Sequence, residues 1–315
     1  MSEPYEEVVD VGGTSLAVRV HPADVVAEGG HARAGAVLVH GLASNARMWD
    51  ACAVALAAAG VTSVAPDLRG HGRSTGLTET RDGATGLAAD QGSAPDRPYG
   101  TSPAAADVEA VVAHFQLDGT VPPPVVLAGQ SWGGNVVLTV AAEHAGQVDA
   151  LALVDGGWLR FDGDEPFEQL WQRLRPPVWG DVTREQVEER IGSAVAAWGP
   201  HALPAVMANL TTDEHGHVRN VLDVAVHEQI LRSVHAADPR SLYPHVGVPV
   251  LLAPAGGPAS ALVEEALEGI PDARLRRYEG AHHDLHLQHP ERLARDLLDL
   301  VDEISLATLP SEGTS

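Results

Sequence analysis

The feature that most constrains this chain is the pentapeptide Gly129-Gln130-Ser131-Trp132-Gly133, a G-x-S-x-G sequence between two apolar segments. Residues 125–128 form an apolar, β-branched run typical of a buried strand, and residues 134–144 have the length and regularity of a helix. A serine on a sharp turn between strand and helix is the pattern of a nucleophile elbow, which lifts the hydroxyl clear of the sheet edge. Glycines two positions to either side are expected because the backbones approach too closely there for a Cβ atom. The first turn of the helix would aim free N–H groups at the same spot.

Strand and helix patterns alternate on both sides of this turn. The alternation predicts an α/β fold with a mostly parallel central sheet and helices on both of its faces. Ser102 and Pro103 are expected to be the N-cap and the first-turn proline of one of the helices. The expected strands are 5–11, 15–21, 36–39, 61–65, 125–128, 150–154, 249–253 and 274–278, and the expected helices are 47–59, 102–115, 134–144, 259–268 and 290–306.

The composition changes at Trp158. From there to residue 244 the chain has helical segments, few strand-like runs and four of its six tryptophans. We therefore expect a core formed by residues 1–157 and 245–306, an inserted helical cap over 158–244, and a flexible tail over 307–315. Residues 75–100 lack apolar periodicity and are expected to form a long loop whose role stays open.

Charge and composition limit the kinds of binding partner and the cellular compartment that we expect for this protein. The formal net charge is −23, and all twenty basic residues are arginines that form no basic run. This excludes nucleic acid and anionic membranes as expected partners. The single cysteine, Cys52, rules out an internal disulfide, and the sequence leads us to expect neither a signal peptide nor a membrane-spanning apolar run. We expect a cytoplasmic protein that acts on a small molecule, either as a monomer or as a homodimer.

Four motifs, in this order, resemble those of the α/β-hydrolase superfamily. They are His40-Gly41, the octapeptide at 67–74 (DLRGHGRS), the elbow at 129–133, and Gly280-Ala281-His282-His283. The resemblance extends over nearly the whole chain, and it is specific because order, spacing and strand context agree. The resemblance implies an α/β-hydrolase fold with a helical cap. It also implies that the protein is a serine hydrolase. A serine at the elbow separates the chain from the haloalkane dehalogenases and epoxide hydrolases of that family, which carry aspartate there.

By that resemblance Ser131 is the nucleophile and His283 is the general base. His282 is the alternative base, because a second histidine stands where the family commonly has glycine. Most of the family carries the acid after the strand at 249–253, but no carboxylate follows here until Glu264. A minority carries it one strand earlier, where Asp155 ends a strand, so Asp155 is assigned to orient His283. The alternatives are that Asp155 only caps a turn, and that Glu264 or a Ser–His dyad serves instead.

The resemblance also implies an oxyanion hole made by the backbone N–H groups of Leu42 and Trp132. The side chains of Leu42, Trp132 and Trp158 are expected to line the substrate pocket. His40, Asp67 and His71 are expected to hold their loops by hydrogen bonds and to have no direct part in the chemistry.

No metal or cofactor is expected. His282, His286 and His289 stand at helical spacing, but no carboxylate or further histidine completes a ligand set. His227-Glu228 resembles the start of H-E-x-x-H, yet position 231 is leucine, and no G-x-G-x-x-G follows a strand.

Together these residues predict a serine hydrolase that cleaves an ester or lactone through an acyl-enzyme. The tryptophans of 158–244 favour a small to medium, largely apolar substrate, although they would equally serve as the core of the cap. The same triad would support a C–C bond hydrolase, a thioesterase or a perhydrolase side activity. A non-catalytic ligand receptor on the same scaffold is the alternative of a different class, followed by a cofactor-free oxygenase or lyase.

Overall fold

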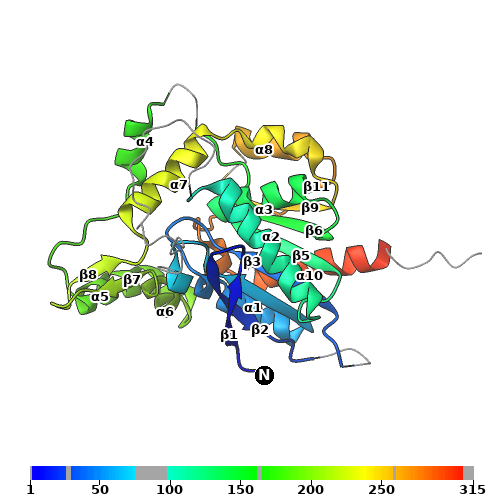
Figure 1. Cartoon of the computed structure of the whole chain (residues 1–315), viewed down its shortest axis with the longest axis horizontal. Helices are drawn as coiled ribbons and strands as arrows, with labels where there is room; N and C mark the ends of the chain where they lie inside the picture. The colour runs from blue at the N-terminus through cyan, green and yellow to red at the C-terminus, as the bar shows by residue number, and fades with distance from the viewer. Residues whose placement is uncertain (1, 26–29, 75–97, 162–164, 258–259, 308–315) are drawn as a thin grey trace, which may run out of the picture.

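The structure is a computed structural model that describes residues 2–25, 30–74, 98–161, 165–257 and 260–307 (Figure 1). Most of the long loop expected at 75–100 lies outside these residues, as does the tail expected at 307–315 except for Ala307, which ends a helix. No helix within the described ranges combines the length and the apolar character that crossing a membrane requires.

The centre of the molecule is an eight-stranded sheet in the order β1-β2-β4-β3-β5-β6-β9-β11. The pairs β1–β2 and β2–β4 are antiparallel, and the other neighbours are parallel, which confirms the mostly parallel sheet predicted from the alternation. The strands are β1 (Tyr5–Asp10), β2 (Ser15–His21), β3 (Ala34–Val39), β4 (Val61–Pro66), β5 (Val125–Gln130), β6 (Ala150–Val154), β7 (Leu210–Thr212), β8 (Val218–Asn220), β9 (Val250–Ala253), β10 (Ala255–Gly256), β11 (Ala273–Leu275) and β12 (Tyr278–Glu279).

Helices cover both faces of this sheet. One apolar cluster joins α2, α3 and α8 to one face, and a second joins α1 and α10 to the other. The helices are α1 (Asp50–Ala58), α2 (Thr101–Leu117), α3 (Trp132–Glu143), α4 (Phe167–Leu174), α5 (Arg184–Val195), α6 (Ala202–Met207), α7 (Val224–Ala236), α8 (Ala261–Gly269), α9 (Leu285–Gln288) and α10 (Pro290–Ala307). Short 3₁₀ turns are η1 (Ala46–Trp49), η2 (Gly72–Ser74), η3 (Ala196–Trp198), η4 (Pro239–Ser241) and η5 (Tyr243–His245).

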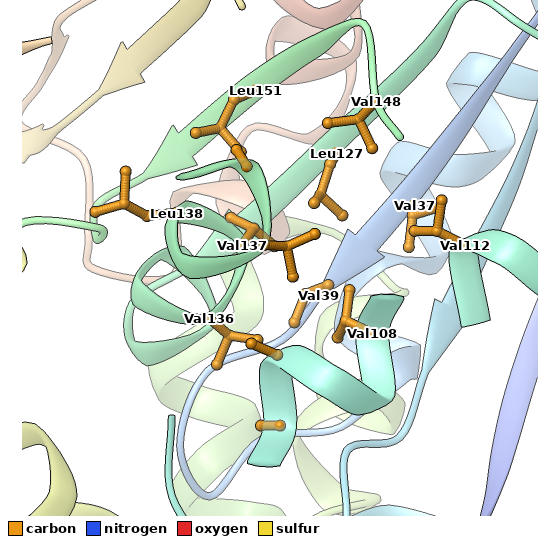
Figure 2. Packing of buried hydrophobic residues seen from close by; sticks show 14 of the residues in the cluster. Val37, Val39, Val108, Val112, Leu127, Val136, Val137, Leu138, Val148 and Leu151 are labelled. Atoms are coloured by element: carbon orange, nitrogen blue, oxygen red, sulfur yellow. The ribbon is translucent and has the colours of Figure 1, made fainter. Parts of the chain in front are cut away.

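The central strands are apolar along their whole length because both of their faces are covered. In β5, Val125 and Leu127 pack into the cluster with α2 and α3, whereas Val126 and Ala128 pack into the cluster with α1 and α10. Figure 2 shows the first of these layers, where Val108 of α2 lies close to Val39 of β3. This packing holds the elbow turn at the end of β5 between two rigid layers.

The strand expected at 274–278 is in fact two short strands. β11 pairs with β9 in the main sheet, and β12 pairs with β10 outside it. Pro254 separates β9 from β10 and has no N–H to donate to a ladder, so regular pairing is interrupted there.

The start of α2 also differs from the expectation that Ser102 caps it. The helix begins at Thr101 after Gly100, and Gly100 has no side chain that could cap the helix. The backbone N–H of Thr101 instead donates to Oγ of Ser233 in α7, at 3.0 Å. A residue 132 positions away supplies this hydrogen bond, so the local pattern around Ser102-Pro103 did not reveal it.

Residues 158–244 are called the inserted segment here. Their described part contains α4 to α7 and the antiparallel hairpin β7–β8, and it gathers at one side of the sheet, left in Figure 1. The turn of this hairpin is held by Asp213, whose carboxylate accepts the N–H groups of His215 and His217.

Candidate active site

The residues singled out in the sequence meet at one edge of the sheet. The parallel strands β3, β5 and β6 end there, and they are followed by the loop at 40–45, the elbow and Asp155. The loop after β12 reaches the same edge, because Nε2–H of Gln130 donates to the carbonyl of His283 at 3.2 Å. Open α/β sheets place their sites at the carboxyl ends of their strands in this way.

Ser131 has the backbone strain expected of an elbow. Its φ is +54° and its ψ is −125°, a conformation that side-chain-bearing residues rarely adopt. The turn is fixed from both sides, since Ser131 N–H donates to the carbonyl of Val154 at 3.0 Å and Gly134 N–H donates to the carbonyl of Ser131 at 2.9 Å. The serine itself is only partly buried.

Glycine is required around this turn because backbone atoms lie where a Cβ would stand. A Cβ on Gly129 would lie 2.3 Å from the carbonyl oxygen of Gly133, and a Cβ on Gly133 would lie 2.4 Å from that of His40. A Cβ on Gly156 would lie 2.0 Å from the carbonyl oxygen of Ser131. The first two contacts explain the glycines of the pentapeptide, and the third had no counterpart in the sequence pattern.

Asp155 and His283 are joined by a short hydrogen bond. Nδ1–H of His283 donates to Oδ2 of Asp155 at 2.5 Å, which fixes the tautomer with Nε2 unprotonated in the neutral ring. Oδ1 of Asp155 accepts the backbone N–H of Ala255 at 2.9 Å. Within the described residues, Oγ of Ser131 and Nε2 of His283 make no hydrogen bond, as is common for catalytic pairs before a substrate binds.

Opposing effects act on the pKa of His283. Burial lowers it, while the hydrogen bond to Asp155 and the charges of Asp155 and Asp284 raise it, and the net result is a raised pKa. Because the side chain is 47% exposed, these charges act through partly screened surroundings. Asp155 therefore stabilises the imidazolium that a general base becomes when it takes a proton.

The two alternative residues lie elsewhere. His282 contacts Trp198 with ring centroids 5.0 Å apart, and its Nδ1 accepts the N–H of Asp284. Glu264 is exposed in the first turn of α8, and among the described residues it makes no contact with His283. The structure thus brings His283, and neither alternative, together with Asp155.

The two expected oxyanion donors belong to the elbow itself and to the loop that packs on it. Trp132 is the first residue of α3, so its N–H has no partner within the helix. Leu42 follows Gly41, which packs so closely on the elbow that a Cβ would stand 2.9 Å from Cβ of Ser131. The next residue, Ala43, has φ +56°, and its N–H donates to Nε2 of His71 at 3.3 Å.

Buried polar side chains hold this loop, as the sequence predicted for His40, Asp67 and His71. His40 Nε2 accepts the N–H of Leu68, and burial lowers the pKa of His40 to about 4, so the ring is neutral. Asp67 accepts the N–H groups of Ala46 and Arg73. Burial likewise lowers the pKa of His71 well below its usual value, which keeps Nε2 of that ring an acceptor for Ala43.

Asn45 is a site-shaping residue that the sequence analysis missed. Its Nδ2–H donates to the carbonyl of Ala205 at 3.0 Å and to Oδ1 of Asn209 at 2.6 Å, which ties the 40–45 loop to the inserted segment. Its Oδ1 accepts the N–H of Arg47. An asparagine before a helix is common in any chain, so only the three-dimensional contact reveals its second role.

The three expected pocket residues differ in exposure. Trp132 is 1% exposed and Trp158 is 5% exposed, and both belong to the main apolar cluster, whereas Leu42 is partly buried. Nε1–H of Trp132 donates to Oγ1 of Thr101 at 3.1 Å. A role in lining the pocket stays a prediction for all three.

Two cavities lie near these loops. One, of about 330 Å³, begins at Ala43 and Ser44 and extends under the inserted segment. The other, of about 650 Å³, lies at the start of α2 between Tyr99 and Ser233, and neither Ser131 nor His283 lines it. The first cavity therefore adjoins the 40–45 loop through Ala43 and Ser44, and Leu42, Ser131 and His283 are not among the residues that line it.

The part of the chain that the structure describes contains no group of three His, Cys, Asp or Glu side chains placed to hold a metal ion. His286 is buried against the ring of Trp49, and the ring of His289 lies against that of Tyr278.

Comparison with known proteins agrees with this arrangement. The model of a family described as the alpha/beta hydrolase family matches residues 36–296. The lipase LipV of Mycobacterium tuberculosis (strain ATCC 25618 / H37Rv) is 29% identical over 177 residues, which is 56% of this chain and 55% of the lipase. The match thus spans about half of that relative's length.

Two solved structures show the same fold. An E-2-(acetamidomethylene)succinate hydrolase superposes with a TM-score of 0.69 at 20% identity, over 95% of this chain and all of that one. A thioesterase domain from the curacin biosynthetic pathway superposes with a TM-score of 0.70 at 16% identity, over 95% of this chain and all of that one. From the family match, the mostly parallel sheet and the elbow that ends β5, it follows that this chain is a member of the alpha/beta hydrolase family.

Proposed function

We propose that this protein is a serine hydrolase that cleaves an ester or lactone of a small to medium, largely apolar substrate. The observation that carries the proposal is the 2.5 Å hydrogen bond between His283 and Asp155, beside a serine held at φ +54°. A hydroxyl is a weak nucleophile at neutral pH and needs a nearby base, which a third group orients.

The mechanism uses these groups in sequence. Ser131 Oγ attacks the substrate carbonyl carbon while Nε2 of His283 takes its proton, and the carboxylate of Asp155 stabilises the imidazolium. The backbone N–H groups of Leu42 and Trp132 bind the negative charge that develops on the carbonyl oxygen. The carbon–oxygen bond to the leaving alcohol then breaks, and His283 returns the proton to that alcohol.

The second half releases the acyl group. Nε2 of His283 takes a proton from water, whose oxygen attacks the acyl carbon, and the oxyanion is held by the same two N–H groups. The bond to Ser131 Oγ breaks, and the proton on His283 passes to the serine oxygen. A carboxylic acid and the unmodified enzyme are left.

A panel of p-nitrophenyl esters and of five- to seven-membered lactones tests the proposal. We expect hydrolysis of at least one class, with a burst of p-nitrophenol equal to the enzyme concentration when deacylation is slow. Ser131→Ala should abolish both burst and turnover, whereas Ser193→Ala, a change at an exposed serine of α5, should leave them unchanged. Turnover of thioesters or of C–C bonds with no cleavage of esters or lactones would refute the substrate class while leaving the nucleophile in place.

A further inference from the structure

The 330 Å³ cavity has a wall suited to a particular kind of substrate group. It begins at Ala43 and Ser44, directly after Leu42, and the inserted segment supplies most of its remaining wall. That wall is mainly apolar, with Leu174 and Trp179 among its side chains, and it also includes the charged residue Arg175. Ala43 is the residue after Leu42, whose N–H the mechanism assigns to the oxyanion hole, whereas Leu42, Ser131 and His283 do not line the cavity themselves.

One side chain of this wall, His227 of α7, has an unused hydrogen-bonding atom. His227 is 5% exposed, and its Nε2–H donates to the carbonyl of Leu174 at 3.1 Å. Nδ1 is therefore an acceptor, and it is buried without a hydrogen-bond partner among the described residues. Burial lowers the pKa of His227, so the ring stays neutral and Nδ1 keeps its lone pair.

A second unused atom lies in the same wall. Oγ of Ser44 is also buried and has no partner in the described part of the chain. The two asparagines of the wall are different, because Asn209 accepts from Asn45 and Asn220 accepts from Nε1–H of Trp179 at 2.8 Å. Buried polar atoms are almost always paired, and these two belong to residues that line one cavity, so we infer that a ligand group supplies their partners.

The chemistry of these two atoms selects the ligand group. Nδ1 of a neutral histidine only accepts, so an ether or ketone oxygen cannot satisfy it. A serine hydroxyl either donates or accepts. An alcohol hydroxyl on an otherwise apolar chain or ring fits both atoms and the apolar wall around them.

We propose that this cavity binds a hydroxyl-bearing apolar part of the substrate, whose O–H donates to Nδ1 of His227 and is flanked by Oγ of Ser44. His227 is then a specificity-determining residue of the reaction, and the substrate class narrows to hydroxylated esters or lactones. This inference rests on the proposed function for the identity of the ligand, but the cavity and its unpaired atoms do not.

The catalytic test compares substrates that differ only in this group. Each ω-hydroxyacyl p-nitrophenyl ester of four to eight carbons is matched with its methyl ether and its deoxy parent. Acetates of the corresponding diols place the hydroxyl on the alcohol side of the bond instead. We expect kcat/KM to be at least about tenfold higher for one hydroxylated member than for its methyl ether, because the ether has no O–H and leaves the buried Nδ1 of His227 unpaired.

Two variants test whether His227 and Ser44 cause the preference for the hydroxylated substrate. His227→Phe keeps a ring and removes the Nδ1 acceptor together with the N–H that donates to the Leu174 carbonyl, and Ser44→Ala removes the second atom from a loop position. Both should reduce the preference for the hydroxyl toward unity, whereas His114→Gln, a change on the far end of α2, should keep it. A preference that persists in both variants overturns the assignment.

A binding measurement separates this inference from the proposed function. Ser131→Ala is titrated with hexan-1-ol and with 1-methoxyhexane, with Trp179 fluorescence as the signal and Trp179→Phe as its control. Tighter binding of the alcohol, lost in His227→Phe, supports the site even if every ester and lactone fails as a substrate. Equal binding of alcohol and ether, with equal turnover of the matched esters, overturns the site while the hydrolase proposal stands.

Discussion

At the scale of single residues, the position of Asp155 decides how the site works. Its φ is +43°, a conformation that non-glycine residues rarely adopt, and its two carboxylate oxygens are divided between His283 and the N–H of Ala255. The carboxylate is thus held from two sides. A residue that only capped a turn would not need to reach a histidine 128 positions away.

Asp155→Asn tests this role. Because an amide gives His283 no negative charge and permits the wrong tautomer, we expect kcat to fall by about 10³- to 10⁴-fold. In the wild type, activity should rise with pH as His283 loses its proton, with a midpoint above the ordinary imidazole pKa. In the variant the residual activity should rise at lower pH. A pH–rate profile whose midpoint does not move would contradict the assignment.

The same pKa direction has a consequence for stability. The pKa of His283 is higher in the folded than in the unfolded protein, so the pair stabilises fully below the unfolded pKa and loses its effect as pH rises through the folded one. Asp155→Asn should therefore lower the melting temperature more at about pH 5.5 than at about pH 9. Equal losses at both values would show that the ion pair does not form in solution.

Gly156 offers a second test at this scale. A Cβ there would stand 2.0 Å from the carbonyl oxygen and 2.6 Å from the nitrogen of Ser131, and backbone atoms cannot rotate away. We expect Gly156→Ala to shift the elbow, to lower the free energy of unfolding by about 1–3 kcal/mol, and to remove most activity. Gly247→Ala is the matched control, because no atom lies within 4 Å of its added Cβ. Full activity in Gly156→Ala would mean that the elbow tolerates displacement.

At the scale of elements, the 40–45 loop is held by hydrogen bonds to two other parts of the chain. His71 from the loop after β4 accepts the N–H of Ala43, and α6 of the inserted segment provides an acceptor for Asn45. Trp198 and His201 of the same segment contact the loop around His283, through the ring of His282 and the carbonyl of Leu287. The inserted segment therefore touches both loops that carry the proposed chemistry.

His71→Phe tests the hold on the oxyanion loop. Phenylalanine keeps the ring that packs between Trp132 and His40 but offers no acceptor to Ala43 N–H. We expect kcat to fall about ten- to a hundredfold, less than the 10²–10³ typical of losing an oxyanion donor outright, with KM little changed. His71→Gln, which retains an acceptor oxygen, should recover part of the loss. A change in KM alone would point to substrate binding instead.

Ser233→Ala tests the contact between α7 and α2. The variant removes the acceptor for the N–H of Thr101 at the start of α2, and the loss of such a capping bond typically costs about 0.5–2 kcal/mol. Urea unfolding should show this decrease, while Ser193→Ala, at an exposed position of α5, should not. An unchanged urea midpoint would mean that the start of α2 is equally stable without the hydrogen bond to Ser233.

At the scale of the whole molecule, periodic and local features were predictable and distant contacts were not. Continuous apolar runs revealed β3, β4, β5, β6 and β9 because both faces of the sheet are buried along these central strands. The pentapeptide revealed the elbow because this turn leaves no room for a Cβ at its flanks, where the carbonyl of Gly133 blocks Gly129 and the carbonyl of His40 blocks Gly133. Three other features depend on residues far apart in sequence, so no periodicity predicts them. They are the division of the strand expected at 274–278, the hydrogen bond from Thr101 to Ser233, and the contact from Asn45 to α6.

The charge of the chain leads to a further expectation. With a formal net charge of −23, repulsion between acidic side chains opposes compaction, and salt screens it within about 10 Å at 0.1 M. The melting temperature should rise when sodium chloride increases from about 10 mM to about 300 mM at neutral pH. A decrease would mean that the arginine–carboxylate pairs, rather than the excess acidity, dominate the surface electrostatics.

The most direct test of the account is covalent labelling with a fluorophosphonate probe, followed by intact-mass measurement and peptide mapping. We expect a single adduct on Ser131 in the wild type, no adduct in Ser131→Ala, and strongly slowed labelling in His283→Ala and Asp155→Asn. Labelling that survives Asp155→Asn at the wild-type rate would move the acid elsewhere, with Glu264→Gln as the next variant. A folded wild-type protein that takes no label would contradict the assignment of Ser131 as an activated nucleophile.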